Sequence, residues 1–409
     1  MTPGCTEVMS AWPQIPRVLA TLNTRLDRLV KPRVRLFGRS IPCFHVCGCV
    51  GLALAFALSQ FVATYCDLSA LVMALLALVA MVAFLAVGLL TTVIVGRETL
   101  VYLHHEVAIL VTSGGVLWAL DLPVLAYLDA VVLGVGGFLV CGRVGCLLVG
   151  CCHGRPAQWG VRYGPDHARE GFFAPYVGLR LLPVPLFESL WVLFVVAIGI
   201  GIVIIGYAPG AALAWYVSAY GLGRFGLEFL RGDLHRPYLG GLSHNQWLTL
   251  LLALVAAVAG LLGAVPAGVG LISEGVFFTL ALFSVLIIVT RRRGCRWPDI
   301  VHPRHVAEVA ALLYQWPARE EDALFVGTTS LGVQLSMGFS YDGGHHTHYG
   351  LSGKERVLSP QDASRLARAL LRVRHAESRG GMLVSGHSEI FHLIVPATVE
   401  GTAVEAESG

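Results

Sequence analysis

Long apolar runs dominate the first 290 residues of the chain. Seven of them approach or exceed the roughly 18 to 20 residues that a helix needs to cross a bilayer. They lie at about 43–66, 69–95, 124–150, 183–207, 211–230, 244–264 and 271–290, and a weaker candidate lies at 99–119. The pattern predicts an all-α polytopic membrane protein with about seven or eight transmembrane helices.

The residues before the first run are polar and basic. Residues 1–42 contain no apolar stretch of the signal-peptide kind. Their basic side chains are Arg17, Arg25, Arg28, Lys31, Arg33, Arg35 and Arg39. We expect them to form a basic N-terminal arm at the membrane surface, ahead of a transmembrane domain at 43–290.

The residues after the last run have the polarity of a soluble protein. A capped helical pattern lies at 359–374, and strand patterns lie at 323–327, 332–340 and 389–397. They predict a small soluble α+β C-terminal domain at 297–409. Its final residues from 398 onward have nothing to bury, and the HHTH segment at 345–348 is interpreted as a surface turn.

Composition supports a lipid environment and excludes one class of partner. Hydrophobic residues make up 56% of the chain and charged residues 13%, against roughly a quarter charged in soluble domains. The net charge is only +3, and the basic residues gather at the ends of the apolar runs. We therefore expect no nucleic-acid partner. The ten cysteines lack the paired spacing of a secreted disulfide scaffold.

Polar side chains recur at helical spacing at the end of the run 211–230. Tyr220, Arg224, Glu228 and Arg231 follow one another at i, i+4, i+8 and i+11 and share one helix face. An arginine within a membrane costs at least about 2.5 to 3.5 kcal/mol, so it needs a partner, a cavity or an anionic ligand. One interpretation is an internal Arg224–Glu228 pair that neutralises itself. The interpretation that we favour is a functional site.

A second arginine interrupts the run 124–150. Arg143 lies in GFLVCGRVGCLLVGCCHGRP, where glycines and cysteines leave room for close backbone approach. A guanidinium group is a planar, permanently charged fork that can bind a phosphate through two hydrogen bonds. Arg143 and Arg224 could hold one phospholipid head group from different helices, which predicts a lipid substrate.

The segment around Arg143 resembles the signature of the prolipoprotein diacylglyceryl transferases. GRVGC followed by GCCHGRP is similar to their G-R-x-G-[NC] segment, in the variant that continues GCC[YH]GRP. In the same order, PAQWGVRY, PVPLFES, AYGLGRFGLEFLRGD and LSHNQWLTL resemble further segments of the family. The resemblance runs from about 100 to 265. Several ordered matches are harder to obtain by chance than one short motif.

The resemblance implies an activity and roles for particular residues. In this family a lipobox cysteine thiol attacks the glyceryl carbon of phosphatidylglycerol at the outer face of the bacterial plasma membrane, and glycerol phosphate leaves. Arg143 and Arg224 would bind phosphatidylglycerol, with Glu188 and Glu228 as supporting acids. The other candidates for shaping the site or binding substrate are Gly142, Gly145, Cys146, His153, Gly154, Tyr220 and Arg231.

The base that deprotonates the acceptor thiol is the least defined part of this hypothesis. A free cysteine has a pKa near 8.5 and is only partly thiolate at neutral pH. The family places a histidine before paired glycines, and the nearest match is His104 and His105 in LHHEVA, where the glycines are missing. Pro185 stands where the family has glutamine, and Cys146 where asparagine is commoner. His153 is an alternative base.

A metal site is the other use that a cysteine and histidine cluster suggests. Cys151, Cys152 and His153 are consecutive, but adjacent cysteines lack the C-x-x-C spacing that binds zinc well. We therefore expect no metal. The family resemblance likewise implies no cofactor.

Membrane orientation brings two lines of argument into conflict. Eight spans put both termini on one side, and the basic residues before 43 and at 291–296 place that side inside. The resemblance instead puts the glycine-rich and proline-rich segments 151–182 and 231–246, candidate substrate-binding caps, at the outer side. A miscount at 99–119 would reconcile the two.

Two alternatives to the lipoprotein transferase remain open. One keeps the phospholipid donor and changes the acceptor. The other is a transporter in which Arg143, Arg224 and Glu228 line an ion path. A transporter is expected to show inverted repeats or broken helices in corresponding halves, and the sequence shows neither.

Overall fold

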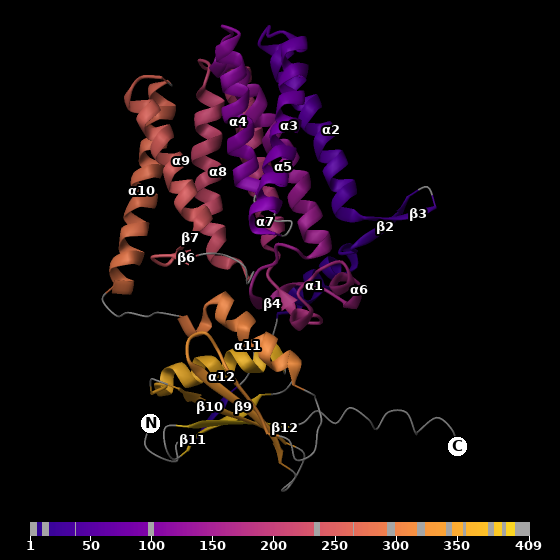
Figure 1. Cartoon of the computed structure of the whole chain (residues 1–409), viewed down its shortest axis with the longest axis vertical. Helices are drawn as coiled ribbons and strands as arrows, with labels where there is room; N and C mark the ends of the chain where they lie inside the picture. The colour runs from indigo at the N-terminus through magenta and orange to yellow at the C-terminus, as the bar shows by residue number, and fades with distance from the viewer. Residues whose placement is uncertain are drawn as a thin grey trace.

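Long helices form a bundle above a smaller α+β domain in the computed structural model of the chain (Figure 1). It describes residues 6–9, 16–36, 38–96, 102–232, 238–264, 266–292, 299–316, 324–340, 346–354, 357–374, 380–386 and 390–396. Arg293 and Arg296 of the basic cluster, and the final residues from 398 onward, lie outside these ranges.

Each apolar run of the sequence forms a helix of the bundle. The helices are α2 (Cys43–Tyr65), α3 (Ala70–Val95), α4 (Tyr102–Ala119), α5 (Val124–Val149), α7 (Val184–Ile205), α8 (Ala211–Leu227), α9 (His244–Leu261) and α10 (Ala267–Arg292). Among the described residues, six of them are long and apolar enough to cross a membrane, namely α2, α3, α5, α7, α9 and α10. The predicted polytopic membrane fold with its α+β tail is confirmed.

Helix α4 is the part of the bundle on which the predicted topology depends. Its sequence is the weak run at 99–119, and its polar residues His105 and Glu106 are buried inside the bundle, with 1% and 4% of their surface exposed. They lower the hydropathy of the run without preventing the helix from packing with α3 and α5. Helix α4 is not among the six described helices that are long and apolar enough to cross a membrane, so the possible miscount at 99–119 stays a prediction. The segments after α5 and α8 lie at the same end of the bundle as the C-terminal domain (Figure 1).

Local signals set the ends of several helices. The Ser69 side chain accepts a hydrogen bond from the main chain of Val72 at the start of α3, and Ser243 with Gln246 forms a capping box at the start of α9. Helix α5 ends at Gly150, whose φ of 81° is in the left-handed region. A Cβ there would lie 2.8 Å from the ring of Phe172, so a side chain would also clash.

The segment 151–182, called the cap below, covers one end of the bundle. It contains β4 (Pro156–Arg162), α6 (Pro165–Arg169), η1 (Ala174–Tyr176) and β5 (Arg180–Leu181), and β4 pairs with β5. A second short segment after α8 contains η2 (Glu228–Leu230), β6 (Tyr238–Leu239) and β7 (Leu242–Ser243). Both were singled out as caps from their composition, although residues 233–237 lie outside the described part of the chain.

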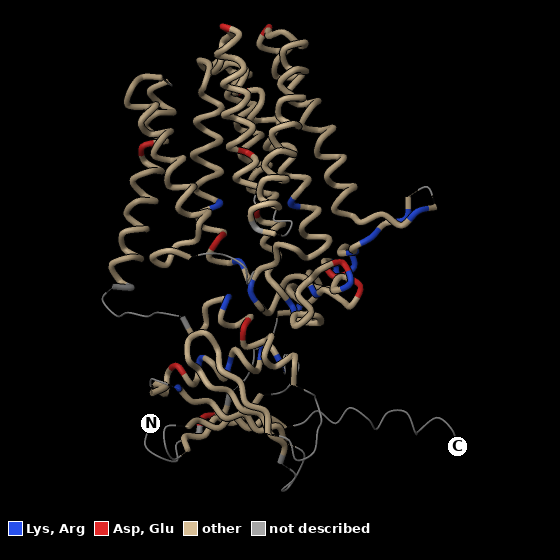
Figure 2. Tube along the Cα trace, in the orientation of Figure 1, with Lys and Arg blue, Asp and Glu red and all other residues tan. Residues whose placement is uncertain are grey.

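The basic N-terminal arm is attached to the cap. Its helix α1 (Arg17–Leu29) is followed by the hairpin β2 (Arg33–Leu36) and β3 (Arg39–Pro42). Asn23 of α1 accepts a hydrogen bond from the Gly160 main chain at 2.9 Å, and Asp27 forms an ion pair with Arg180 at 2.9 Å. Lysine and arginine gather at this end of the bundle, next to the C-terminal domain (Figure 2).

The C-terminal domain is a six-stranded antiparallel sheet covered by two helices. The strand order is β1-β11-β12-β10-β9-β8, and the N-terminal β1 pairs with β11 at the edge. The elements are β1 (Thr6–Met9), η3 (Asp299–Val301), α11 (Pro303–Gln315), β8 (Phe325–Thr328), β9 (Val333–Ser340), β10 (His346–Gly353), α12 (Pro360–Arg374), β11 (Gly381–Ser385) and β12 (Phe391–Pro396).

The sequence patterns located about half of the helices and strands of this domain. The helix at 359–374 and the three strands were located, whereas α11, β10, β11 and β1 were not. The surface turn at 345–348 is wrong because His346 to His348 begin β10, where alternate side chains are buried. His345 lies outside the described residues.

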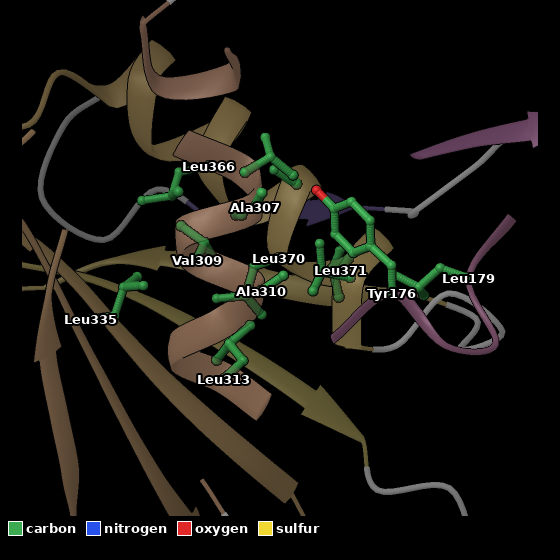
Figure 3. Packing of buried hydrophobic residues seen from close by; sticks show 14 of the residues in the cluster. Tyr176, Leu179, Ala307, Val309, Ala310, Leu313, Leu335, Leu366, Leu370 and Leu371 are labelled. Atoms are coloured by element: carbon green, nitrogen blue, oxygen red, sulfur yellow. The ribbon is translucent and has the colours of Figure 1, made fainter. Parts of the chain in front are cut away.

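The C-terminal domain docks on the cap. Tyr176 is fully buried and, with Leu179, belongs to the same hydrophobic cluster as Ala307 of α11 and Leu371 of α12. Figure 3 shows Tyr176 and Leu179 approaching these two helices from the cap. The tail is therefore packed against the segment that covers the bundle.

Candidate active site

Three helices of the bundle bring charged groups to one point near the cap. The Nη2 atom of Arg143, on α5, lies 3.1 Å from Oε1 of Glu188, on α7. The Nε atom of Arg224, on α8, lies 3.5 Å from the same oxygen. Arg143, Glu188 and Arg224 are 7%, 0% and 4% exposed. The structure thus brings together the two arginines that the sequence analysis singled out.

The end of α8 adds three more groups. Nη1 of Arg224 lies 2.7 Å from Oε2 of Glu228, so the predicted Arg224–Glu228 pair is present. Nη1 of Arg231 lies 3.8 Å from Oε2 of Glu188, and the Tyr220 hydroxyl donates a hydrogen bond of 3.2 Å to Oε1 of Glu188. Glu188 is therefore the carboxylate around which the other groups gather.

Several charged side chains are buried together in this cluster. In the part of the chain that the structure describes, three guanidinium groups contact the carboxylates of Glu188 and Glu228. Removing ions from water costs several kcal/mol each, which only good partners offset. Glu228 pairs with Arg224, and Glu188 lies within 4 Å of Arg143, Arg224 and Arg231. Guanidinium groups from different elements thus lie close together, and groups of this kind can bind a phosphate through paired hydrogen bonds.

Main-chain hydrogen bonds tie the cap to the segment after α8. Gly154 and Arg231 form an antiparallel bridge, and the Arg155 N–H donates to the Leu230 carbonyl at 3.1 Å. The Gly154 N–H donates to the Leu182 carbonyl, and a Cβ on Gly154 would lie 2.7 Å from that oxygen. Close backbone approach at Gly154 thus fixes the position from which Arg231 reaches the cluster.

Three cysteine thiols gather beside Arg143. Cys146 is on the last turn of α5, and Cys151 and Cys152 follow the turn at Gly150. The three Sγ atoms all lie within 4.8 Å of one another, with 3.9 Å between those of Cys151 and Cys152. Nη1 of Arg143 lies 3.7 Å from Sγ of Cys152. The sequence pattern pointed to the adjacent pair alone, because Cys146 is separated from it along the chain.

The surroundings of Cys152 favour its thiolate. Hydrogen bonds from the thiols of Cys146 and Cys151 hold the pKa of Cys152 well below its usual range, and the guanidinium groups of Arg231 and Arg143 act in the same direction. Burial opposes the shift without cancelling it. Negative charge is therefore stabilised next to the arginine cluster.

The candidate bases lie in different places. Nε2 of His104 is 3.1 Å from Nε2 of His244, at the start of α9, and Nδ1 of His105 is 3.0 Å from the Phe84 carbonyl on α3. His153 is buried in the cap, where its ring packs edge-on against aromatic rings and Nδ1 lies 3.0 Å from the Gly154 carbonyl. The structure does not gather these histidines around one position.

Two glycines on α5 have different surroundings. An added Cβ at Gly145 would lie 3.1 Å from Cβ of Cys47 on α2, so this glycine allows the two helices to pack closely. An added Cβ at Gly142 would have no neighbour within 4 Å. Tyr102 is a neighbour that the sequence analysis missed, because its ring centroid lies 6.0 Å from the Arg143 guanidinium carbon. It lies at the start of α4, the helix formed by the weaker candidate run of the sequence.

Comparison with known proteins matches this region to one family. Residues 34–262, more than half of the chain, match the family model described as prolipoprotein diacylglyceryl transferase. The chain is 34% identical over 134 residues to a phosphatidylglycerol--prolipoprotein diacylglyceryl transferase 2 of Clostridium perfringens (strain 13 / Type A), covering 32% of this chain and 48% of the relative.

Two further relatives give the same picture. A phosphatidylglycerol--prolipoprotein diacylglyceryl transferase of Clostridium tetani (strain Massachusetts / E88) is 32% identical over 134 residues, which are 32% of this chain and 51% of the relative. The phosphatidylglycerol--prolipoprotein diacylglyceryl transferase 2 of Streptomyces coelicolor (strain ATCC BAA-471 / A3(2) / M145) is 35% identical over 145 residues. The match covers 33% of this chain and 42% of the relative. The chain spans about half the length of these curated relatives.

Proposed function

Because the chain belongs to the prolipoprotein diacylglyceryl transferase family, we propose that it transfers the diacylglyceryl group of phosphatidylglycerol to the lipobox cysteine of prolipoproteins and releases glycerol phosphate. Its partners are then phosphatidylglycerol, other membrane lipids and lipobox peptides, and its place is the plasma membrane of a bacterium. The observation that carries the proposal is the buried cluster in which Arg143, Arg224 and Arg231 surround Glu188.

The cluster is suited to the charge that moves in this reaction. The phosphodiester of phosphatidylglycerol carries one negative charge, and the departing glycerol phosphate gains a second as its bond to the glyceryl carbon breaks. Guanidinium groups fixed in a buried site stabilise such developing charge better than water, because they need no reorganisation. Glu188 and Glu228 hold Arg143 and Arg224 in place before the lipid binds.

The transfer changes two bonds. The acceptor Sγ forms a bond to the glyceryl carbon, and the bond from that carbon to the phosphate oxygen breaks, with its electron pair going to the oxygen. The thiol proton must leave before or during the attack, since the thiolate is the nucleophile. Arg143 and Arg224 act on the leaving phosphate, which leaves the deprotonation of the acceptor to another group.

The position of the cluster fits a donor from the membrane and an acceptor from outside it. Arg143 is six residues from the end of α5, and Arg224 is three residues from the end of α8, both next to the cap. A phospholipid head group lies at this depth while its acyl chains stay among the helices. The lipobox cysteine also lies at the membrane boundary, where a signal segment leaves the bilayer.

A transfer assay tests the proposal. The full-length chain in vesicles that contain labelled phosphatidylglycerol is incubated with a lipobox peptide, and the peptide mass is measured. We expect the mass of one diacylglyceryl group to be added to the cysteine peptide and none to a serine version. A folded and inserted chain that modified no lipobox peptide, or that labelled a different acceptor instead, would contradict the proposal.

A further inference from the structure

The arrangement of three thiols beside Arg143 points to a metal site. Zinc binds thiolate sulfur at about 2.3 Å, which puts two sulfurs of a tetrahedral site about 3.8 Å apart. Sγ of Cys151 lies 3.9 Å from Sγ of Cys152, and Sγ of Cys146 lies within 4.8 Å of both. A small movement of side chains closes this set around one ion.

The sequence pattern alone disfavoured a metal because adjacent cysteines bind zinc poorly. The fold brings a third cysteine, Cys146, close to the adjacent pair. The left-handed turn at Gly150 reverses the chain after α5 and returns Cys151 and Cys152 to the last helical turn, where Cys146 is located. A Cβ at Gly150 would clash with Phe172, so the turn depends on glycine.

We propose that Cys146, Cys151 and Cys152 bind one zinc ion whose fourth position takes the thiolate of the acceptor cysteine. Three protein ligands with an open fourth position is the pattern of catalytic zinc, whereas structural zinc has four protein ligands. A thiol that binds zinc is deprotonated outright. The inference rests on the proposed transferase function and supplies the step that the arginine cluster does not perform.

Charge in the site is consistent with this assignment. Zinc with three thiolates carries one net negative charge, and the permanently charged guanidinium group of Arg143 lies beside Cys152. Arg143 connects the two sites, since one of its nitrogens contacts Glu188 and another lies 3.7 Å from Sγ of Cys152. Partners of this kind orient the ligands of a metal site.

The resulting step balances. The acceptor thiol loses its proton to solvent as its sulfur binds zinc. The sulfur then attacks the glyceryl carbon of a phosphatidylglycerol held by Arg143 and Arg224, and glycerol phosphate leaves with the electron pair of the broken C–O bond. The product sulfur is a neutral thioether, a weaker zinc ligand than a thiolate, so the lipidated peptide is released.

Metal analysis of the full-length chain, purified through a tag without histidine, tests the site itself. We expect about one zinc per chain, and at least about a ten-fold lower content in Cys146→Ser, Cys151→Ser and Cys152→Ser. Cys66→Ser is the matched control, because Cys66 is an exposed cysteine next to α2, and it should keep the zinc. A chain without metal, a chain that holds copper instead, or a disulfide among the three cysteines would overturn the proposal.

Replacement of zinc by cobalt tests the open position without relying on turnover. A lipobox peptide should raise the sulfur-to-cobalt charge-transfer absorption by about one third, as three thiolate ligands become four, and a serine peptide should not. An unchanged spectrum would contradict the role in acceptor binding. Transfer that persists in a zinc-free chain would overturn this inference and leave the proposed function standing. A zinc-loaded chain that modifies no peptide would instead count against the proposed function.

Discussion

Helices α5 and α10 each contain 26 residues, and their spans have almost the same mean hydropathy, 2.2 and 2.3. Within the protein, 61% of the apolar stretch of α5 is buried, against 17% for α10. Helix α5 packs against α2, α4, α7 and α8, whereas α10 packs mainly against α8 and α9. Hydropathy therefore identifies both as membrane helices and does not say which one lies at the centre.

Small residues and one charge distinguish the central helix. Gly136 of α5 lies so close to α7 and α8 that a Cβ would come within 2.5 Å of Val196 and 2.7 Å of Tyr216. Gly275 of α10 would meet no atom within 4 Å. Arg143 adds a charge that needs a partner, a cavity or an anionic ligand within the membrane, and Glu188 is such a partner. The family match ends at residue 262, so α5 is inside it and α10 outside.

The largest expected effect concerns the carboxylate beside α5. Glu188→Gln removes the acid that Arg143, Arg224 and Arg231 share, and breaking a buried ion pair costs about 3–5 kcal/mol. We expect a loss of unfolding free energy of that size and a loss of transfer activity. The measurement is reversible unfolding in mixed micelles, together with the transfer assay. Glu274→Gln on α10 is the control and should keep both properties.

An anionic lipid sharpens this prediction. If the cluster binds phosphate, phosphatidylglycerol should restore part of the stability that Glu188→Gln loses, and a neutral lipid should not. Equal stability of Glu188→Gln and the wild type in neutral lipid would show that Glu188 does not hold the arginines together.

The second effect concerns helix packing. Gly136→Ala introduces a methyl group that overlaps side chains of α7 and α8, and overpacking costs about 3 kcal/mol at the upper end of its usual range. Gly275→Ala should be neutral or stabilising by up to about 1 kcal/mol, because alanine favours a helix. Unfolding of both variants in the same micelles measures the difference. Equal stabilities would contradict the central position of α5.

The smallest effect concerns cavities. Leu139→Ala on α5 removes a side chain that is 2% exposed, and Leu282→Ala on α10 removes one that is 70% exposed. The first leaves a cavity between helices and should cost about 2 kcal/mol, the lower end for such changes, because lipid is as apolar as the site that is lost. The second should cost little, since lipid fills the space. A larger loss for Leu282→Ala in thermal unfolding would reverse the comparison.

Much of the fold could be predicted because its signals are local. Apolar runs located the helices of the bundle to within a few residues, and Ser359 with the helical pattern after it located α12. Strand β1 was missed because its partner is distant in sequence, whereas β10 and β11 pair with the adjacent strands β9 and β12 and were missed for lack of a clear strand pattern. Residues 6–9 pair with 381–384, a contact that no local pattern predicts.

Only part of the candidate site could be predicted from the sequence, because the site depends on contacts between residues that are distant in the chain. Arg143, Arg224 and Glu188 were selected from their chemistry and the family motifs, and the structure joins them across three helices. The thiol trio was missed because its geometry depends on the turn at Gly150. His104 and His105 were candidates by position along the chain, but their contacts lie with His244 on α9 and Phe84 on α3.

The central claim is that the guanidinium groups of Arg143 and Arg224 bind one phosphate together, each through two hydrogen bonds. The direct test compares initial rates of diacylglyceryl transfer by Arg143→Lys, Arg224→Lys and the surface control Arg169→Lys, which pairs only with Asp166 of its own helix among the contacts described. An ammonium group keeps the charge and loses the two-pronged geometry. We predict a loss of at least about a hundred-fold in each of the first two variants and none in the control. Rates near that of the wild type in both Arg143→Lys and Arg224→Lys would contradict the account.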